Sequence, residues 1–318
     1  ELLELAQVLN APVITTPEGK GAFPEDNPLS LGTIYNGHGP GHHVVPQADV
    51  ILAVGSRMHM VPPVDWSPKP HQTLIQIDAD PEEVGRNIPV TTGVAADGRL
   101  ALQDLLAELG GKTHASHWVQ GDLDSIRNTT KEEIRAMAPL QVEIINTIRQ
   151  ELDDDAIMVA GTTEVGYWSH LAFPALTPRS YLTSSYFATL GYAFPTALGA
   201  KIGNPNRQVV ATSGDGGFGY ASSELATAVQ EGLNVVTILF NNESFGASYA
   251  DQENRFGGRV IGTRIHNPDY AKLAESYGAV GINLSGHEEL GPALREALKA
   301  KSPVLIEVPI PNLVPPFQ

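Results

Sequence analysis

Short apolar segments rich in Val and Ile alternate with helical segments along most of the chain, and this alternation limits the possible folds most strongly. Buried strands of parallel sheets have such near-continuous apolar runs, because helices cover both sheet faces. In the second half the pattern predicts strands at 156–160, 208–213, 234–240, 280–283 and 304–308. It predicts helices at 140–152, 192–202, 221–231, 269–276 and 288–300. The second half is therefore predicted to be a doubly wound parallel α/β domain.

The first half shows the same alternation with less regularity. The pattern predicts strands at 12–15, 50–55 and 73–78 and helices at 1–9 and 99–109. Residues 110–130 have no sustained apolar period and are rich in Gly, Ser, Thr, His and Asp, which predicts an interdomain linker. We therefore expect two doubly wound parallel α/β domains, at residues 1–125 and 126–318. The chain opens directly in a helix, so we expect the first domain to be truncated at its N-terminus.

Charge and cysteine content exclude several classes of protein. The 318 residues include 20 basic and 36 acidic side chains, a net charge of −16, which repels nucleic acids and anionic lipids. The absence of cysteine excludes disulfides, thiolate metal centres and a cysteine nucleophile. No apolar run is long enough to span a bilayer, and the first residues do not resemble a signal peptide. We expect a soluble, cytoplasmic protein without nucleic-acid or membrane partners.

Two strand ends carry residues suited to binding a metal and a diphosphate. Gly214-Asp215-Gly216-Gly217 follows one predicted strand, and Asn241-Asn242-Glu243-Ser244-Phe245-Gly246 follows the next. Ligands of open parallel sheets bind at the carboxyl ends of strands. Carboxylate and amide oxygens suit Mg²⁺, and glycine backbone can approach phosphate closely, with the helix predicted at 221–231 adding its N-terminal dipole. The two loops together predict a Mg²⁺–diphosphate site.

The spacing of these motifs resembles that of thiamine-diphosphate-dependent enzymes. The chain has Gly-Asp-Gly, then 24 residues, then Asn-Asn, which is similar to the signature of that family. The segment 190–195 resembles the family's segment before the Gly-Asp-Gly loop, and the segments 18–24 and 28–32 resemble its middle domain. The resemblance covers essentially the whole chain, as the middle and diphosphate-binding domains of the acetolactate synthase and benzoylformate decarboxylase branch.

The resemblance implies roles for individual residues. Asp215 and Asn242 are implied to bind Mg²⁺ through side chains, and Ser244 through its backbone carbonyl. Leu190 matches the apolar residue that supports the bent cofactor, and the backbone of Ala188 is implied to contact its aminopyrimidine ring. The other implied cofactor-binding residues are Glu164, Gly214, Gly216, Gly217, Phe245 and Gly246. The activating glutamate of the family is expected on a pyrimidine-binding domain outside this chain, so the catalytic residue is unknown and the chain alone is expected to be inactive.

The substrate loops depart from acetolactate synthases. Glu164 and Val165 stand where those enzymes carry a Gln-His pair, and the segment 247–253 lacks their tryptophan. The expectation is therefore a broader class, a thiamine-diphosphate- and Mg²⁺-dependent lyase or carboligase of 2-oxo acids, forming a homodimer or tetramer. Two alternatives stay open. One is a non-catalytic cofactor-binding or assembly fragment, and the other is a flavin-linked 2-oxo acid oxidase.

Several other segments have candidate ligand groups. His38, His42 and His43 suggest a metal cluster, but Gly39 and Gly41 argue against a helix that would align them, which favours a loop or interface segment. The segment 54–57 follows a predicted strand, at a position that could hold FAD, as in some members of the family that the chain resembles. The acidic run 153–155 is interpreted as a solvated turn. His266 and Glu253 are left without an assigned role.

Overall fold

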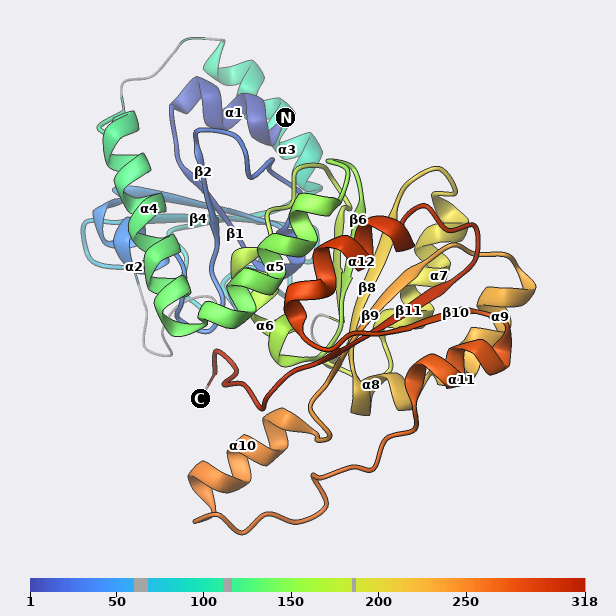
Figure 1. Cartoon of the computed structure of the whole chain (residues 1–318). Helices are drawn as coiled ribbons and strands as arrows, with labels where there is room; N and C mark the ends of the chain where they lie inside the picture. Colours follow the sequence, from blue (N-terminus) through green and yellow to red (C-terminus); the bar gives the residue numbers. More distant parts are fainter. Residues whose placement is uncertain (60–67, 111, 113–115, 185–186, 318) are drawn as a thin grey trace. The chain divides into compact units, whose positions relative to one another are not determined.

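The computed structural model describes residues 1–59, 68–110, 112, 116–184 and 187–317. These residues form two compact units, Glu1–Ile134 and Arg135–Gln318. Figure 1 shows both units, and each is described separately below. No helix among the described residues has both the length and the apolar character needed to cross a membrane.

Unit 1 is an α/β unit with two parallel sheets. Strands β1 and β2 pair with each other, and the second sheet has the order β3-β4-β5. The elements are α1 (Leu2–Leu9), β1 (Val13–Thr15), η1 (Pro17–Gly19), β2 (Ser30–Thr33), α2 (Gly41–Val44), η2 (Val45–Gln47), β3 (Val50–Val54), β4 (Thr73–Asp78), β5 (Thr92–Ala95), α3 (Gly98–Leu109) and α4 (Gln120–Met137). Phe23, Leu31 and Leu123 are almost fully buried in its core.

Unit 2 contains one six-stranded sheet, and every pair of neighbouring strands is parallel. Its first elements are α5 (Pro139–Glu151), β6 (Ile157–Ala160), α6 (Glu164–Ala172), β7 (Tyr181–Thr183), α7 (Ala193–Gly203), β8 (Val209–Gly214), α8 (Asp215–Gly219), η4 (Ser222–Glu224), α9 (Leu225–Gln230) and β9 (Val236–Asn241). Then follow α10 (Gly246–Arg255), α11 (Tyr270–Tyr277), β10 (Val280–Asn283), η5 (His287–Glu289), α12 (Leu290–Ala297) and β11 (Val304–Pro309). The predicted parallel α/β fold is confirmed.

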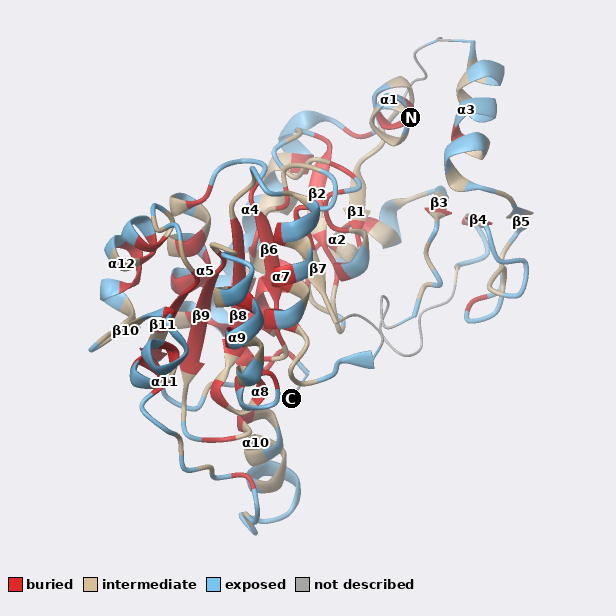
Figure 2. Ribbon diagram, turned by 90° about the vertical axis from the view of Figure 1, so that its right-hand side faces the viewer, coloured by how far each residue is buried: buried red, intermediate tan, exposed pale blue. Residues whose placement is uncertain are grey.

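The strand order of unit 2 creates one position suited to a ligand. The order is β10-β11-β9-β8-β6-β7, so the chain moves from β6 to β7 on one side and then returns to β8 on the other side. The connections that leave β6 and β8 therefore diverge, and the space between their carboxyl ends is where such sheets bind ligands. Figure 2 shows β6, β8 and β9 as buried strands with more exposed helices around them.

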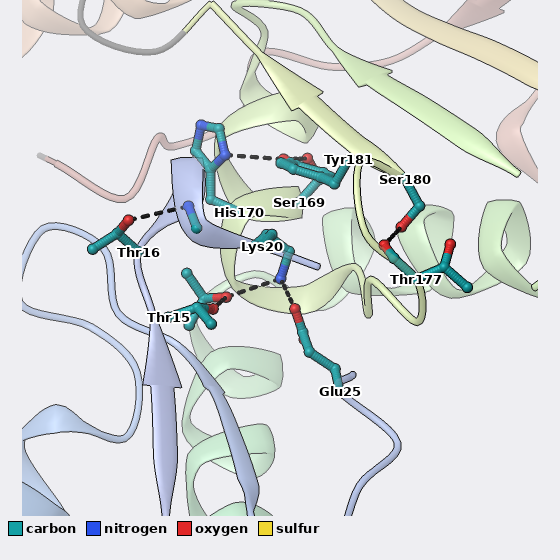
Figure 3. A network of polar contacts seen from close by, with 11 residues as sticks. Thr15, Thr16, Lys20, Glu25, Ser169, His170, Thr177, Ser180 and Tyr181 are labelled. Carbon is teal, nitrogen blue, oxygen red and sulfur yellow. Dashed lines mark hydrogen bonds and ion pairs between the residues drawn. The ribbon is translucent and has the colours of Figure 1, made fainter. Parts of the chain in front are cut away.

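Buried polar contacts hold elements of each unit in place, and Figure 3 shows one group of them from each unit. In unit 1, the Lys20 ammonium donates to Glu25 Oε1 at 2.7 Å and to Thr33 Oγ1 at 2.9 Å. In unit 2, the Tyr181 hydroxyl lies 2.7 Å from Ser169 Oγ and 2.9 Å from His170 Nδ1. Because Ser169 and His170 lie on α6, these contacts tie α6 to β7.

The expected linker contains a helix instead of irregular chain. Helix α4 runs through residues 120–137, and the two units divide between Ile134 and Arg135, beyond the boundary expected near residue 125. The buried face of α4 is only Leu123, Thr130 and Ile134, a narrow stripe interrupted by a polar residue. An amphipathic pattern this weak is easily missed in the sequence. Residues 111 and 113–115 of the expected linker lie outside the described residues.

The connection between β8 and β9 also differs from the prediction. A single helix was expected at 221–231, but α8 begins at Asp215 itself and is followed by η4 and α9. The Gly-rich sequence of α8 argues against a helix by propensity, since glycine costs about 1 kcal/mol relative to alanine in a helix. The expected dipole contribution at the Gly-Asp-Gly loop therefore cannot come from the helix predicted at 221–231.

Candidate active site

The two motif loops lie at the same edge of the sheet. Gly214 of β8 pairs with Phe240 of β9, so Asp215 and the Asn241-Asn242 pair follow directly from neighbouring strand positions. The two strands are therefore neighbours in the sheet. Since parallel strands all end on one side, the sheet register alone brings the two loops together.

The Asp215 carboxylate is buried and accepts several hydrogen bonds. Its Oδ1 accepts from the Gly216 amide at 2.9 Å, and its Oδ2 accepts from Asn267 Nδ2 at 2.7 Å. The backbone amides of Glu243 and Ser244 lie near this carboxylate and also favour its ionised form. Burial raises the pKa of Asp215 above its ordinary value, while these donors partly oppose the rise. The donors fix the carboxylate at the edge of the sheet.

The Asn242 side chain is held between a carboxylate and an amide. Its Nδ2 donates to Glu164 Oε1 at 3.0 Å, and its Oδ1 accepts from the Ser244 amide at 3.2 Å. An ionised carboxylate can accept hydrogen bonds but cannot donate them. Glu164 therefore holds the Asn242 Nδ2 group toward itself, and Asn242 Oδ1 points away from Glu164. Burial raises the pKa of Glu164, with the Asp215 charge adding to the rise.

The side chains of Asp215 and Asn242 lie beside the same backbone segment. Asn242 Oδ1 accepts from the Ser244 amide at 3.2 Å, and the same amide is near enough to favour the ionised form of the Asp215 carboxylate. Ser244 pairs with Arg264 in an isolated bridge whose hydrogen bonds use the Glu243 carbonyl and the Phe245 amide. That pairing does not use the carbonyl of Ser244. Three hard oxygen groups at one edge fit Mg²⁺, which takes few protein ligands and completes its octahedron with phosphate and water.

Two glycines are required by close packing beside these groups. A Cβ on Gly216 would lie 2.6 Å from the Phe245 ring. A Cβ on Gly246 would overlap Glu164 Oε1 and lie 2.7 Å from Asn242 Nδ2. The structure therefore brings Gly216, Phe245, Gly246, Glu164 and Asn242 into one packed group.

The remaining implied cofactor residues surround the same loop. Leu190 is half-buried, and its Cδ2 lies 3.7 Å from the position of a Cβ on Gly217. Gly214 ends β8 against Thr163, which caps α6 by accepting from the Gly166 amide at 3.0 Å. Ala188 is exposed and has a positive φ of 45°, an uncommon conformation for alanine.

Sequence reasoning missed two residues of the site. Asn267 Nδ2 donates to Asp215 Oδ2 and also to Asn241 Oδ1, at 2.9 Å. The Tyr270 hydroxyl lies 3.1 Å from the Asp215 carbonyl and 3.0 Å from Asn267 Oδ1. Burial, together with the charges of Asp215 and Glu307, raises the pKa of Tyr270. Only the Asn-Pro-Asp sequence before α11 marks this position, and it is a common helix-start pattern.

Residues considered for the substrate loops lie in different environments. Val165, which stands where acetolactate synthases carry the histidine of the Gln-His pair, is fully buried. Glu253 is exposed on α10 and accepts from the Tyr249 hydroxyl at 2.8 Å, and His266 is exposed. The run 153–155 is an exposed turn, as predicted.

Unit 1 contains a separate pocket of about 430 Å³. It lies at the ends of β1 and β3 and is lined mainly by apolar side chains such as Ile14, Ile34 and Leu52. Gly55 and Ser56, which belong to the segment considered for FAD, also line it. Gly55 has a positive φ of 59° and open space around its Cβ position, so the backbone there is accessible to a ligand.

The interpretation of residues 38–43 as a simple loop needs a correction. Gly41–Val44 forms the short helix α2, with Pro40 as its N-cap. Both His42 and His43 approach Glu133 of α4, a residue 90 positions away from His43. The carboxylate comes from a distant helix, so the histidines approach it without a long helix of their own.

Comparison with known proteins identifies the same family as the geometry. Residues 161–308 match the thiamine pyrophosphate enzyme C-terminal TPP binding domain, and residues 1–105 match the thiamine pyrophosphate enzyme central domain. A putative thiamine pyrophosphate-containing protein of Bacillus subtilis is 32% identical over 99% of this chain and 55% of its own length.

Two further relatives carry more specific names. A probable acetolactate synthase large subunit of Methanocaldococcus jannaschii is 34% identical over 98% of this chain and 54% of its own length. A probable 2-ketoarginine decarboxylase of Pseudomonas aeruginosa is 33% identical over 96% of this chain and 55% of its own length. The chain thus spans just over half the length of the curated relatives it matches. It belongs to the thiamine pyrophosphate enzyme family, of which it contains the central domain and the C-terminal TPP binding domain.

Proposed function

We propose that this protein is a thiamine-diphosphate- and Mg²⁺-dependent lyase or carboligase that acts on 2-oxo acids. The observation that carries the proposal is the position of Asp215 and Asn242 at the edge where β8 and β9 end, with the backbone of Ser244 beside both side chains. Membership of the thiamine pyrophosphate enzyme family supports the cofactor. When bound, thiamine diphosphate supplies an electron sink that allows a 2-oxo acid to lose CO₂.

The residues of the chain then bind and orient the cofactor. Asp215, Asn242 and the Ser244 carbonyl hold Mg²⁺, which neutralises part of the diphosphate charge. The backbone of Gly216 and Gly217 offers amides to the diphosphate, because no Cβ keeps the anion away. Leu190 beside Gly217 supplies apolar support for the bent cofactor. Ala188, Gly214, Phe245 and Gly246 are also proposed to contact the cofactor.

Glu164 has a positioning role in this proposal. Its carboxylate accepts from Asn242 and so turns the amide oxygen toward the metal position. Ligand-orienting partners of this kind influence metal affinity strongly. Glu164 replaces the glutamine of acetolactate synthases, and Val165 is buried in place of their histidine. The substrate loop therefore supports a 2-oxo acid other than that of acetolactate synthase.

Activation of the cofactor is proposed to need a pyrimidine-binding domain, from the same or a partner chain, in a dimer or tetramer. The names of the relatives include both a synthase and a decarboxylase, so either simple decarboxylation or carboligation is compatible with this site.

A calorimetric titration of the chain with thiamine diphosphate tests the proposal. We expect binding heat in Mg²⁺, none in EDTA, and at least tenfold weaker binding for Asp215→Ala. Asp154→Asn is the matched control, because this carboxylate lies on the exposed turn before β6. Equal binding by Asp215→Ala and the unchanged chain would refute the proposed site. No binding under any condition would favour the alternative of a non-catalytic assembly fragment.

A second candidate function rests on the pocket of unit 1. Its position at the end of β3, beside Gly55 and Ser56, is compatible with FAD, and a bound flavin would support oxidation of a 2-oxo acid. The visible absorbance of the purified protein distinguishes the two functions. Flavin absorbance that stays with the chain through gel filtration supports the oxidase, and its absence after saturation with FAD excludes it.

A further inference from the structure

Two histidines and a glutamate meet on the surface of unit 1, whereas the thiamine diphosphate motifs belong to unit 2. His43 Nε2 lies 3.1 and 3.2 Å from the two Glu133 carboxylate oxygens, and His42 Nε2 lies 3.4 Å from Glu133 Oε2. The ligand atoms of all three side chains lie within 4.8 Å of one another. Within the parts of the chain that the structure describes, no other group of three metal-ligating side chains meets this criterion.

The convergence of two consecutive histidines is unusual for a helix. Successive helical residues point about 100° apart, so neighbouring side chains normally diverge. Here the two rings lie 3.8 Å apart, centroid to centroid, and both turn toward Glu133. Two imidazoles and one carboxylate form a donor set suited to zinc and similar transition metals.

The distances also fit a tetrahedral centre. Metal–ligand bonds of about 2.0–2.1 Å at tetrahedral angles separate neighbouring ligand atoms by about 3.3 Å. The measured separations of 3.1–3.4 Å between imidazole nitrogens and carboxylate oxygens agree with that value. Three protein ligands leave the fourth position for water or another small ligand.

The surrounding structure holds both helices against the end of β2. Gly39 must be a glycine because a Cβ there would overlap the Thr33 carbonyl, and a Cβ on Gly41 would contact Ile34 at 3.0 Å. These close approaches fix the start of α2. Helix α4 is fixed by Arg127, which donates to the Ser30 carbonyl at 3.1 Å. The ligands are therefore positioned by the same strand before any metal binds.

The exposure of the side chains allows a metal to enter. The His42, His43 and Glu133 side chains are 45%, 26% and 39% exposed. We propose that His42, His43 and Glu133 form a second metal site in unit 1, which binds one Zn²⁺ or a similar transition-metal ion with an open coordination position. His42 also lines the pocket of unit 1, so the ion adds positive charge to the wall of that pocket.

Competition with a chromophoric chelator tests this site in the full chain, with excess Mg²⁺ present. We expect the unchanged chain to take up one equivalent of Zn²⁺. Glu133→Gln should bind it at least tenfold more weakly, and a combined His42→Gln and His43→Gln variant should lose it. Glu132→Gln is the matched control, because Glu132 is exposed and adjacent on the same helix. His71→Gln controls for surface histidines, and Asp215→Ala should leave Zn²⁺ uptake unchanged.

Cobalt(II) provides an independent readout of the same ligands. Intense visible bands typical of tetrahedral coordination should form with the unchanged chain and with Glu132→Gln, and should be lost with Glu133→Gln. Circular dichroism establishes that each variant remains folded. The proposal is wrong if the unchanged chain takes up no Zn²⁺, because the cluster is then only hydrogen-bonded. It is also wrong if Glu132→Gln and Glu133→Gln weaken binding equally, or if the double histidine variant retains the ion.

Discussion

Asn267 Nδ2 donates a hydrogen bond to Asp215 Oδ2 at 2.7 Å, which links the segment before α11 to the end of β8. The same amide reaches Asn241 Oδ1 at 2.9 Å. Asn267 thus holds the carboxylate and the neighbouring strand end together. Its position makes it a test of how the proposed metal site is organised.

Replacing Asn267 with alanine should weaken the site without removing a proposed ligand. The buried Asp215 oxygen would lose its partner, at a cost of about 1–3 kcal/mol in local stability. We expect faster hydrogen exchange at the β8 and β9 amides and weaker Mg²⁺-dependent binding of thiamine diphosphate. Asn128→Ala, on the exposed face of α4, should change neither property. If hydrogen exchange at the β8 and β9 amides is unchanged in Asn267→Ala, the hydrogen bond between Asn267 and Asp215 does not organise the site.

Replacing Glu164 with glutamine should reduce Mg²⁺ affinity by about 10–100-fold, as loss of a ligand-orienting partner does. Glutamine has nearly the same shape but can donate as well as accept, so it no longer fixes which way the Asn242 amide points. Calorimetry with Mg²⁺ and thiamine diphosphate measures the effect. An unchanged affinity in Glu164→Gln would rule out the positioning role of this carboxylate.

Cofactor binding should release protons at pH values around the raised pKa of Asp215. Burial raises the pKa of Asp215 above 3.8 and that of Glu164 above 4.5. Between the ordinary and raised pKa values the folded chain binds more protons than the unfolded chain, so its stability falls as pH rises through this window. Metal binding requires ionised Asp215, so Mg²⁺ affinity should instead rise with pH.

Calorimetry in two buffers of different ionisation enthalpy measures this proton release. Release should be largest around the raised pKa values and should disappear at pH values well above them, and Asp215→Asn should lack the part that this carboxylate contributes. Affinity that falls as pH rises would contradict the assignment of Asp215 as a metal ligand.

Two glycine-to-alanine substitutions should change the stability of the protein in opposite directions. Gly246→Ala places a methyl group onto the Glu164 carboxylate, so we expect a loss of about 1–3 kcal/mol in stability and weaker cofactor binding. Gly199 is exposed in α7 with nothing within 4 Å of its Cβ position. Gly199→Ala should stabilise the protein by about 0.5–1 kcal/mol. Thermal unfolding of the two variants measures both effects, and a stabilised Gly246→Ala would contradict the packing described here.

The sequence predicted those features that depend on short-range patterns. The strands β8 and β9 are apolar runs, and their parallel register places Asp215 and Asn242 at one edge, as expected. Asn267 and Glu133 were missed because their partners are 52 and 90 residues away in the chain. Helix α4 was missed because it has few apolar residues, and α8 because three of its five residues are glycine.

The position of the divalent cation is the sharpest test of the proposed thiamine diphosphate site. Crystals of the chain grown with thiamine diphosphate and Mn²⁺ would reveal the ion by its anomalous scattering. We expect one peak bonded to Asp215, Asn242 and the Ser244 carbonyl, with diphosphate oxygens completing the shell. A diphosphate bound elsewhere, or a cation at this edge that does not contact Asp215, would contradict the proposed site.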